Sequence, residues 1–267
     1  MARRGHVRLW LVGAVVAVIV SAAFPFERDG AARGASVRRP APQQHYPREY
    51  IEIEPIPRLK NVQGTAFSVS GGTRWMTARH VIERCNSGQL SGGSRDTSIS
   101  EVLISETDDV AILKTEATAA RHFLISARRP EPGDAAYLFG FAQGEAQVVP
   151  VKLLGAASAR QGYSPYPVQT VLNWVEAAGA GDSRELSGMS GGPALNANGE
   201  AVGVFSASGI RRGRVVTANP WPLAQFDKLI PQSGASASRP IKDREDAAVY
   251  LGQMVRARSL RELVCES

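Results

Sequence analysis

The feature that most restricts the possible fold is a series of short apolar segments separated by glycine, asparagine, serine and proline. Each segment is rich in β-branched or aromatic residues and is shorter than a typical helix. Many short strands at such spacing are typical of β-sandwiches and β-barrels. The sequence therefore predicts an all-β protein. The segments are 64–70, 101–105, 110–116, 135–141, 146–155, 168–176, 200–208 and 214–218.

Helical periodicity is expected in only two places, Trp221–Ile230 and the tail from about Lys242 to Cys265. In the tail, four apolar side chains recur on one helical face. Such a stripe is usually a packing surface, so we expect the tail to form a helix that docks on the β-structure. The four side chains are those of Tyr250, Leu251, Met254 and Val255.

The first 57 residues predict a leader and a tether. Arginines precede an apolar run at Leu9–Phe26, which suits either a cleaved signal peptide or a signal anchor, so both interpretations of residues 1–26 stay open. Residues 27–57 are rich in Pro, Arg, Ala and Gln and are expected to be a disordered tether. We therefore expect an exported protein, periplasmic or extracellular, that is soluble after cleavage or attached to the membrane through residues 9–26.

The positive charge lies mainly in this leading region. The net charge is +6, and residues 1–60 hold ten Lys and Arg against five Asp and Glu, so the remainder is nearly neutral. Nucleic-acid binding requires a basic surface on the folded part. The charge distribution therefore disfavours a nucleic-acid partner.

One serine lies in an unusually glycine-rich setting. Ser190 stands in "SGMSGGP", and a serine hydroxyl becomes a nucleophile at neutral pH only when an imidazole accepts its proton. Of the four histidines, His6 lies in the leader, His45 lies in the tether and His122 has no motif around it. The remaining one, His80, follows a strand-like segment in "TRWMTARHVIERC" and is the candidate base.

Three motifs together resemble a known family. "TARHVI" at 77–82, "DVAIL" at 109–113 and "GMSGGP" at 188–193 resemble, in this order, the motifs of trypsin-like serine endopeptidases with the chymotrypsin fold, of the compact bacterial type. The resemblance extends from about Arg58 to Gln232. It implies two packed six-stranded antiparallel β-barrels, the first at 58–130 and the second at 131–232, followed by a C-terminal helical tail at 233–267.

The resemblance also implies roles for single residues. His80 matches the general base, Asp109 the acid that orients it and Ser190 the nucleophile. Asp108 is the alternative carboxylate, but the motif places the acid directly before the apolar strand. The backbone amides of Gly188 and Ser190 match the oxyanion hole, where glycine lets the chain aim its N–H groups at the developing charge.

The implied substrate contacts are a strand after the nucleophile and the residue six before it. Ser206, Ala207 and Ser208 match the strand segment that supports a bound peptide, and Arg184 stands at the position that often helps to select the cleaved side chain. Met189 replaces the aspartate that relatives activated by cleavage use for an ion pair with a new N-terminus. Activation by that ion pair is therefore not expected.

Cys85 and Cys265 are the only cysteines. In an exported protein they are candidates for one disulfide, with two free thiols as the alternative. With so few Cys and His residues we expect no metal site and no cofactor.

Two classes of function follow from these patterns. The first is an active serine endopeptidase of the cell envelope that acts on polypeptides through an acyl-enzyme. The second is a protein of the same fold that has lost its chemistry and binds a partner, with a non-enzymatic envelope scaffold as a further possibility. Residues suited to all three catalytic roles favour the endopeptidase. The sequence leaves the oligomeric state and the cleaved bond open.

Overall fold

The computed structural model describes residues 50–53, 61–69, 72–92, 96–116, 118–161, 168–177, 186–208, 213–218 and 236–266. The leader predicted at 1–26, the helix predicted at 221–230 and Arg184 lie outside the described residues. Most of the predicted tether does as well.

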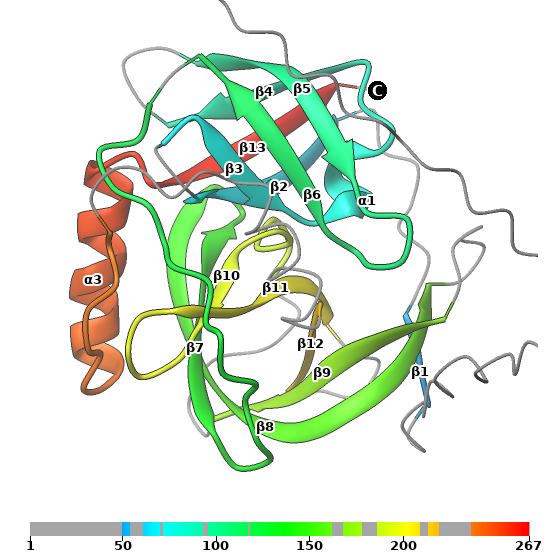
Figure 1. The fold of residues 1–267 in the computed structure, drawn as a ribbon, viewed down its shortest axis with the longest axis vertical. Coiled ribbons are helices and arrows are strands. Elements are labelled where there is room, and N and C mark those ends of the chain that lie inside the picture. The colour runs from blue at the N-terminus through cyan, green and yellow to red at the C-terminus, as the bar shows by residue number, and fades with distance from the viewer. Residues whose placement is uncertain are drawn as a thin grey trace, which may run out of the picture. The chain divides into compact units, whose positions relative to one another are not determined.

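The first barrel is closed and has six strands, in the order β13-β2-β3-β6-β5-β4 (Figure 1). Its neighbours in this order pair antiparallel. The strands are β2 (Asn61–Val69), β3 (Arg74–Thr77), β4 (Ser87–Ser91), β5 (Thr97–Ile104), β6 (Ala111–Thr115) and β13 (Leu260–Glu266).

The second barrel also has six antiparallel strands, in the order β8-β7-β10-β11-β12-β9, and the pairing of β8 with β9 closes it. The predicted fold, two six-stranded antiparallel barrels and a C-terminal helix, is confirmed. The strands are β7 (Ala135–Ala142), β8 (Glu145–Gln161), β9 (Gln169–Glu176), β10 (Pro193–Leu195), β11 (Ala201–Ser208) and β12 (Arg214–Ala218).

The predicted tether is wrong at its end. Residues Tyr50–Ile53 form the strand β1, which pairs in parallel with β8 from Ser158 to Gln161. Ile51 packs on a small apolar cluster of the second barrel that includes Ala157 and Val216. Partial burial of Ile51, together with pairing to β8, holds a segment whose composition alone predicts disorder.

The predicted tail helix is correct over its first half and wrong over its second. Helix α3 (Arg244–Arg256) starts at Asp243, whose carboxylate accepts a hydrogen bond from the N–H of Asp246. It ends before Arg258, which adopts a left-handed conformation with φ of 54°. Beyond it, Leu260–Glu266 form β13, because pairing with both β2 and β4 satisfies its backbone and buries Leu260, Leu263 and Cys265.

The face of α3 that the sequence predicts is the buried one. Tyr250, Leu251 and Met254 are buried, and Val255 is partly buried. Tyr250 makes edge-to-face contacts with Phe123 and with Phe139 of the second barrel. One apolar cluster therefore runs from the first barrel through α3 to the second and fixes the two barrels against each other.

Candidate active site

His80 lies on a single helical turn at the contact between the barrels. Strand β3 ends at Thr77, and α1 (Arg79–Ile82) follows after Ala78. Val81 and Ile82 are buried in the apolar core and anchor this turn. The His80 ring is consequently held at a rigid strand end, with its side chain only 5% exposed.

Asp109 contacts both the ring and the backbone of His80. Its Oδ2 atom lies 2.7 Å from His80 Nδ1, and its Oδ1 atom accepts a hydrogen bond from the His80 backbone N–H at 2.9 Å. Because Nδ1 faces a carboxylate, the neutral ring carries its proton there and leaves Nε2 free to accept another. Asp108 instead accepts a hydrogen bond from the Thr107 hydroxyl. The structure thus brings together His80 and Asp109, the carboxylate that the sequence favours.

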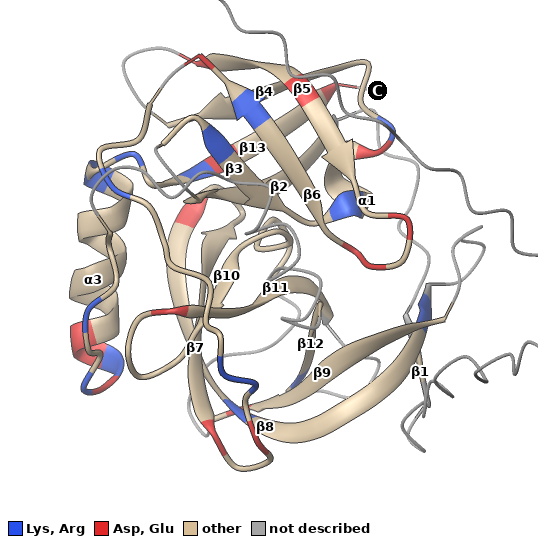
Figure 2. Ribbon diagram, in the orientation of Figure 1, with Lys and Arg blue, Asp and Glu red and all other residues tan. Residues whose placement is uncertain are grey.

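A tight turn between β5 and β6 presents this carboxylate. The N–H of Ser105 donates to the carbonyl of Val110, and the Ser105 hydroxyl accepts from the N–H of Asp108. The buried guanidinium of Arg79 donates from Nη1 to the Ser105 carbonyl at 3.0 Å. Figure 2 shows the resulting acidic loop next to the basic segment of α1.

The surroundings of Asp109 favour its ionised form. Burial alone would raise its pKa, but the charge and hydrogen bonds of His80, with a further contribution from Arg79, outweigh burial and lower the pKa. Burial raises the pKa of Asp108, against the hydrogen bond of Thr107 and the charge of Arg79. The two neighbouring carboxyls are therefore tuned in opposite directions, and the one that contacts His80 stays charged.

Gln169 is a site residue that the sequence does not reveal. It begins β9 in the second barrel, is buried, and its Oε1 atom accepts a hydrogen bond from the backbone N–H of Asp109 at 2.8 Å. The acid is thus supported from both barrels. A glutamine at a strand end has no pattern that distinguishes it from an ordinary polar residue.

The nucleophile loop requires its glycines for close contacts between the barrels. Gly188 and Gly191 have φ of 97° and 92°, the left-handed region that favours glycine. A Cβ atom on Gly191 would overlap the carbonyl of Thr65 and the hydroxyl of Thr77 and would lie 2.9 Å from the N atom of Ala78. The loop therefore lies directly against the segment that leads into His80.

Ser190 lies close to α1, but its hydroxyl is turned to another partner. A Cβ atom on Gly64 would lie 2.6 Å from Val81 Cγ1 and 3.0 Å from the Ser190 carbonyl, so these two residues flank the same glycine. The Ser190 hydroxyl donates to the carbonyl of Ser206 at 3.4 Å. The described part of the chain contains no hydrogen bond between Ser190 and His80.

Two backbone amides of this loop are unpartnered among the described residues. The N–H groups of Met189, Gly191 and Gly192 donate to carbonyls of the same barrel, whereas those of Gly188 and Ser190 donate to none. These are the two amides that the sequence assigns to the oxyanion hole.

The predicted substrate strand lies at the end of β11. Ser206 is 3% exposed, and its hydroxyl has no hydrogen-bond partner within the described residues. Strand β10 pairs with β11 only between Ala201 and Val204. The segment from Ser206 to Ser208, which includes Ala207, therefore has one edge that is unpaired in the described residues, the geometry that an extended peptide needs.

Met189 occupies an apolar position. It is completely buried in the core of the second barrel, and a Cβ atom on Gly140 of β7 would lie 3.0 Å from its Cβ. The position used by relatives for an activating ion pair is thus filled by packing.

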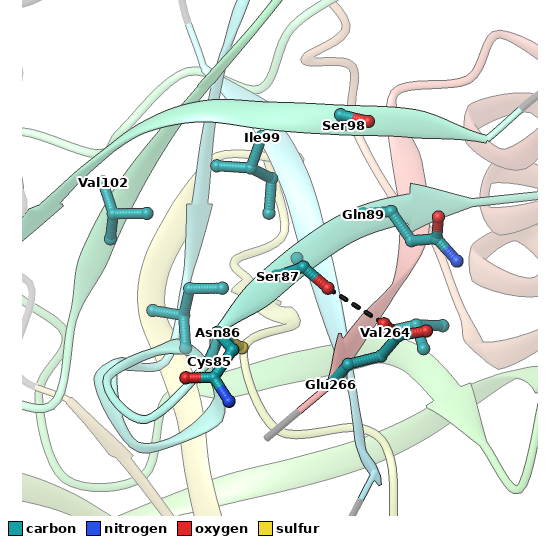
Figure 3. Close-up of a pocket in the computed structure, with 11 residues that line it drawn as sticks. Cys85, Asn86, Ser87, Gln89, Ser98, Ile99, Val102, Val264 and Glu266 are labelled. Carbon is teal, nitrogen blue, oxygen red and sulfur yellow. Dashed lines mark hydrogen bonds between the residues drawn. The ribbon is translucent and has the colours of Figure 1, made fainter.

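The two cysteines are joined. Cys85, after α1, and Cys265, on β13, form the predicted disulfide. Beside it, a cavity of about 350 Å³ opens between the ends of β4, β5 and β13 (Figure 3); Cys85 lines it, but none of the predicted catalytic or substrate-binding residues does. In the described ranges no cluster of His, Cys, Asp and Glu could hold a metal ion, and none of the described helices is long and apolar enough to cross a membrane.

The fold and this arrangement define a class, the two-barrel peptidases with a serine and a histidine at the barrel contact. Solved structures share the fold. The active form of the Rv3671c protease from Mycobacterium tuberculosis aligns with a TM-score of 0.54 at 20% identity, over 80% of this chain and 96% of that chain. An inactive form of the same protease aligns with a TM-score of 0.51 at 22% identity, over 63% and 84%.

Comparison of the sequence with protein families is more specific than comparison of the folds. The model of the trypsin-like peptidase domain matches residues 64–204, which is more than half of the chain. The protein therefore belongs to the trypsin-like peptidase family and is by class a serine endopeptidase, a hydrolase that acts on polypeptides. A search of curated protein sequences found no match.

Proposed function

We propose that the protein hydrolyses peptide bonds with Ser190 as nucleophile, His80 as general base and Asp109 as the group that orients His80. The observation that carries this proposal is the pair of contacts between Asp109 and His80, one to Nδ1 and one to the backbone N–H. The amides of Gly188 and Ser190, which have no partner among the residues that the structure describes, support it, because an oxyanion hole needs donors that are available to the substrate.

The reaction requires the Ser190 hydroxyl to exchange the Ser206 carbonyl for His80 Nε2, by rotation about its Cα–Cβ bond. Oγ then attacks the substrate carbonyl carbon while its proton passes to Nε2. The tetrahedral oxyanion accepts hydrogen bonds from Gly188 and Ser190. His80 returns the proton to the departing amine, and water hydrolyses the resulting acyl-enzyme by the same sequence of transfers.

A second candidate function has one observation in its favour. The Ser190 hydroxyl donates a hydrogen bond to the Ser206 carbonyl and none to His80. A hydroxyl without a base as its partner is what a member of the fold that only binds a partner would have. The two candidates differ in the reactivity of the hydroxyl.

A fluorophosphonate probe separates the two candidates, because it labels only an activated serine. We expect wild-type protein to be labelled and to cleave fluorescein-labelled casein, and Ser190→Ala and His80→Ala to do neither while keeping the wild-type unfolding temperature. Ser187→Ala, in the same loop but outside the proposed machinery, is the control and keeps the label. A folded wild-type protein that takes no label would contradict the proposal and support the binding module.

We propose further that the protein works in the cell envelope, on the basis of the arginines and the apolar run at Leu9–Phe26. Fusion of residues 1–57 to an alkaline phosphatase that is active only after export is expected to give activity. Exchange of Val16 and Val18 for arginine should abolish it. Activity that survives this exchange would contradict the export role.

A further inference from the structure

Thr65 of β2 is completely buried at the contact between the barrels, and all of its polar groups form hydrogen bonds. Its N–H donates to the Ser190 carbonyl at 2.7 Å, and its own carbonyl accepts from the Thr77 hydroxyl at 2.8 Å. Its hydroxyl donates to the Gly188 carbonyl and accepts from the Phe141 N–H, both at 2.9 Å. One side chain of the first barrel thus joins two segments of the second.

The orientation of this hydroxyl is fixed. A threonine hydroxyl has a single hydrogen to donate, and here it points at the Gly188 carbonyl while the Phe141 N–H occupies a lone pair. The Gly188 carbonyl therefore has a defined direction. The N–H group of the same peptide, that of Met189, donates to the Leu186 carbonyl. Both polar groups of this peptide are therefore held by hydrogen bonds.

The neighbouring peptides of the loop are anchored in the same way. The Ser187 carbonyl accepts from the Gln143 N–H, and the Met189 carbonyl accepts from the Gly192 N–H, each at 2.9 Å. In a trans peptide the N–H points opposite to the C=O, so these anchors direct the N–H groups of Gly188 and Ser190 away from their carbonyl partners. The Thr65 hydroxyl is the anchor between these two peptides and the only one of these three supplied by a side chain.

The nucleophile loop at 186–192 contains no charged side chain, and Met189 within it is packed in an apolar core. Hydrogen bonds such as the one from Thr65 therefore fix the conformation of these residues. We propose that Thr65 is a positioning residue for the reaction: its hydroxyl, bound between Phe141 and Gly188, holds the nucleophile loop in the conformation that presents both amides to the substrate. This role rests on the proposed function, since it concerns the same oxyanion hole.

The test compares three substitutions in the full chain. Thr65→Val keeps the shape and removes the hydroxyl, Thr65→Ser keeps the hydroxyl, and Thr115→Val is the matched control. Thr115 is also buried in the first barrel, where its hydroxyl accepts a hydrogen bond from Trp75 Nε1. Kinetics are measured with a peptide substrate selected from a library by the wild-type protein.

We expect Thr65→Val to lower kcat by about 10- to 100-fold with little change in KM, less than the roughly 10²- to 10³-fold loss on removing an oxyanion donor outright. Thr65→Ser and Thr115→Val should stay within about threefold of wild type. A folded Thr65→Val with wild-type kcat would overturn the proposal, as would equal losses in Thr65→Val and Thr65→Ser. If Thr65→Val does not fold, Thr65→Ala takes its place with the same expectation.

A second measurement does not depend on catalysis. In amide hydrogen exchange followed by mass spectrometry, Thr65→Val should speed exchange in 140–144 and 186–192 by tenfold or more, and Thr65→Ser should not. If the wild-type protein cleaves nothing, the proposed function fails while this exchange experiment still decides the role of Thr65. Unchanged exchange in both segments would refute it.

Discussion

Asp109 is held in place by three of its own polar groups. Oδ2 faces the His80 ring, Oδ1 accepts the His80 backbone N–H, and its own N–H donates to Gln169. A carboxylate fixed in this way selects one tautomer and one orientation of the imidazole. Its neighbour Asp108 makes none of these contacts. A substitution of Asp108 is therefore a control for the same substitution of Asp109.

Asp109→Asn is expected to lower kcat by about 10⁴-fold, because an amide at this place can stabilise the wrong tautomer of His80 and offers no charge to the imidazolium. Asp108→Asn should stay within about threefold of wild type. The measurement is kcat on the library-selected peptide. Comparable losses in both variants would show that the loop as a whole, and not the carboxylate at 109, supports the reaction.

The lowered pKa of the Asp109 carboxyl predicts that the folded protein loses stability at acid pH. Its pKa in the fold is lowered from the ordinary value of 3.8, so it stabilises the folded state above that value. This contribution is lost as the pH falls through the folded pKa. Urea unfolding at pH 7 and pH 3 should show a smaller drop in unfolding free energy for Asp109→Asn than for wild type. An equal drop would assign the acid sensitivity to other groups.

The elements show what the sequence could and could not predict. Short apolar segments and turn residues predict an all-β protein, and the resemblance carried by three short motifs implies the two barrels and the candidates His80, Asp109 and Ser190. The second half of the tail is predicted as helix because Leu260 and Leu263, three positions apart, have the spacing of a helical face, whereas in the observed strand they lie on opposite faces. Residues 260–266 form a strand because β2 and β4 both pair with them and so close the first barrel. Gln169 and Thr65 were not found because their partners are distant in sequence and are backbone atoms.

Strand β13 should therefore contribute to global stability. Leu263 is completely buried in the first barrel, and Leu263→Ala is expected to lower the unfolding free energy by about 2–5 kcal/mol. Val249→Ala, on the exposed face of α3 where the side chain is 53% exposed, should change it by less than about 0.5 kcal/mol. Urea unfolding measures both. Similar values for the two variants would place β13 outside the cooperative core.

At the scale of the whole molecule, the first barrel is closed by segments that are far apart in the chain, β2 and β13. The disulfide joins the segment after α1 to β13 across 180 residues. In the chain-entropy model a loop of this length stabilises the fold by up to ~5 kcal/mol. The bond also ties the turn that carries His80 to the strand that closes the first barrel.

Replacing both cysteines by serine should consequently lower the melting temperature while casein cleavage remains measurable below it. Differential scanning calorimetry of the variant and of wild type, with and without dithiothreitol, tests this. The reductant should lower the melting temperature of the wild type only. A variant that melts at the wild-type temperature would show that the apolar cluster through α3 suffices.

The position of β13 between β2 and β4 also affects the order of events during synthesis. A ribosome releases residues 260–266 after every other strand described here, so the barrel that carries the base cannot close on a partial chain. A chain that lacks these residues leaves β2 and β4 without the strand that joins them, so the support of the barrel that carries His80 and Asp109 is incomplete until the last described strand is in place.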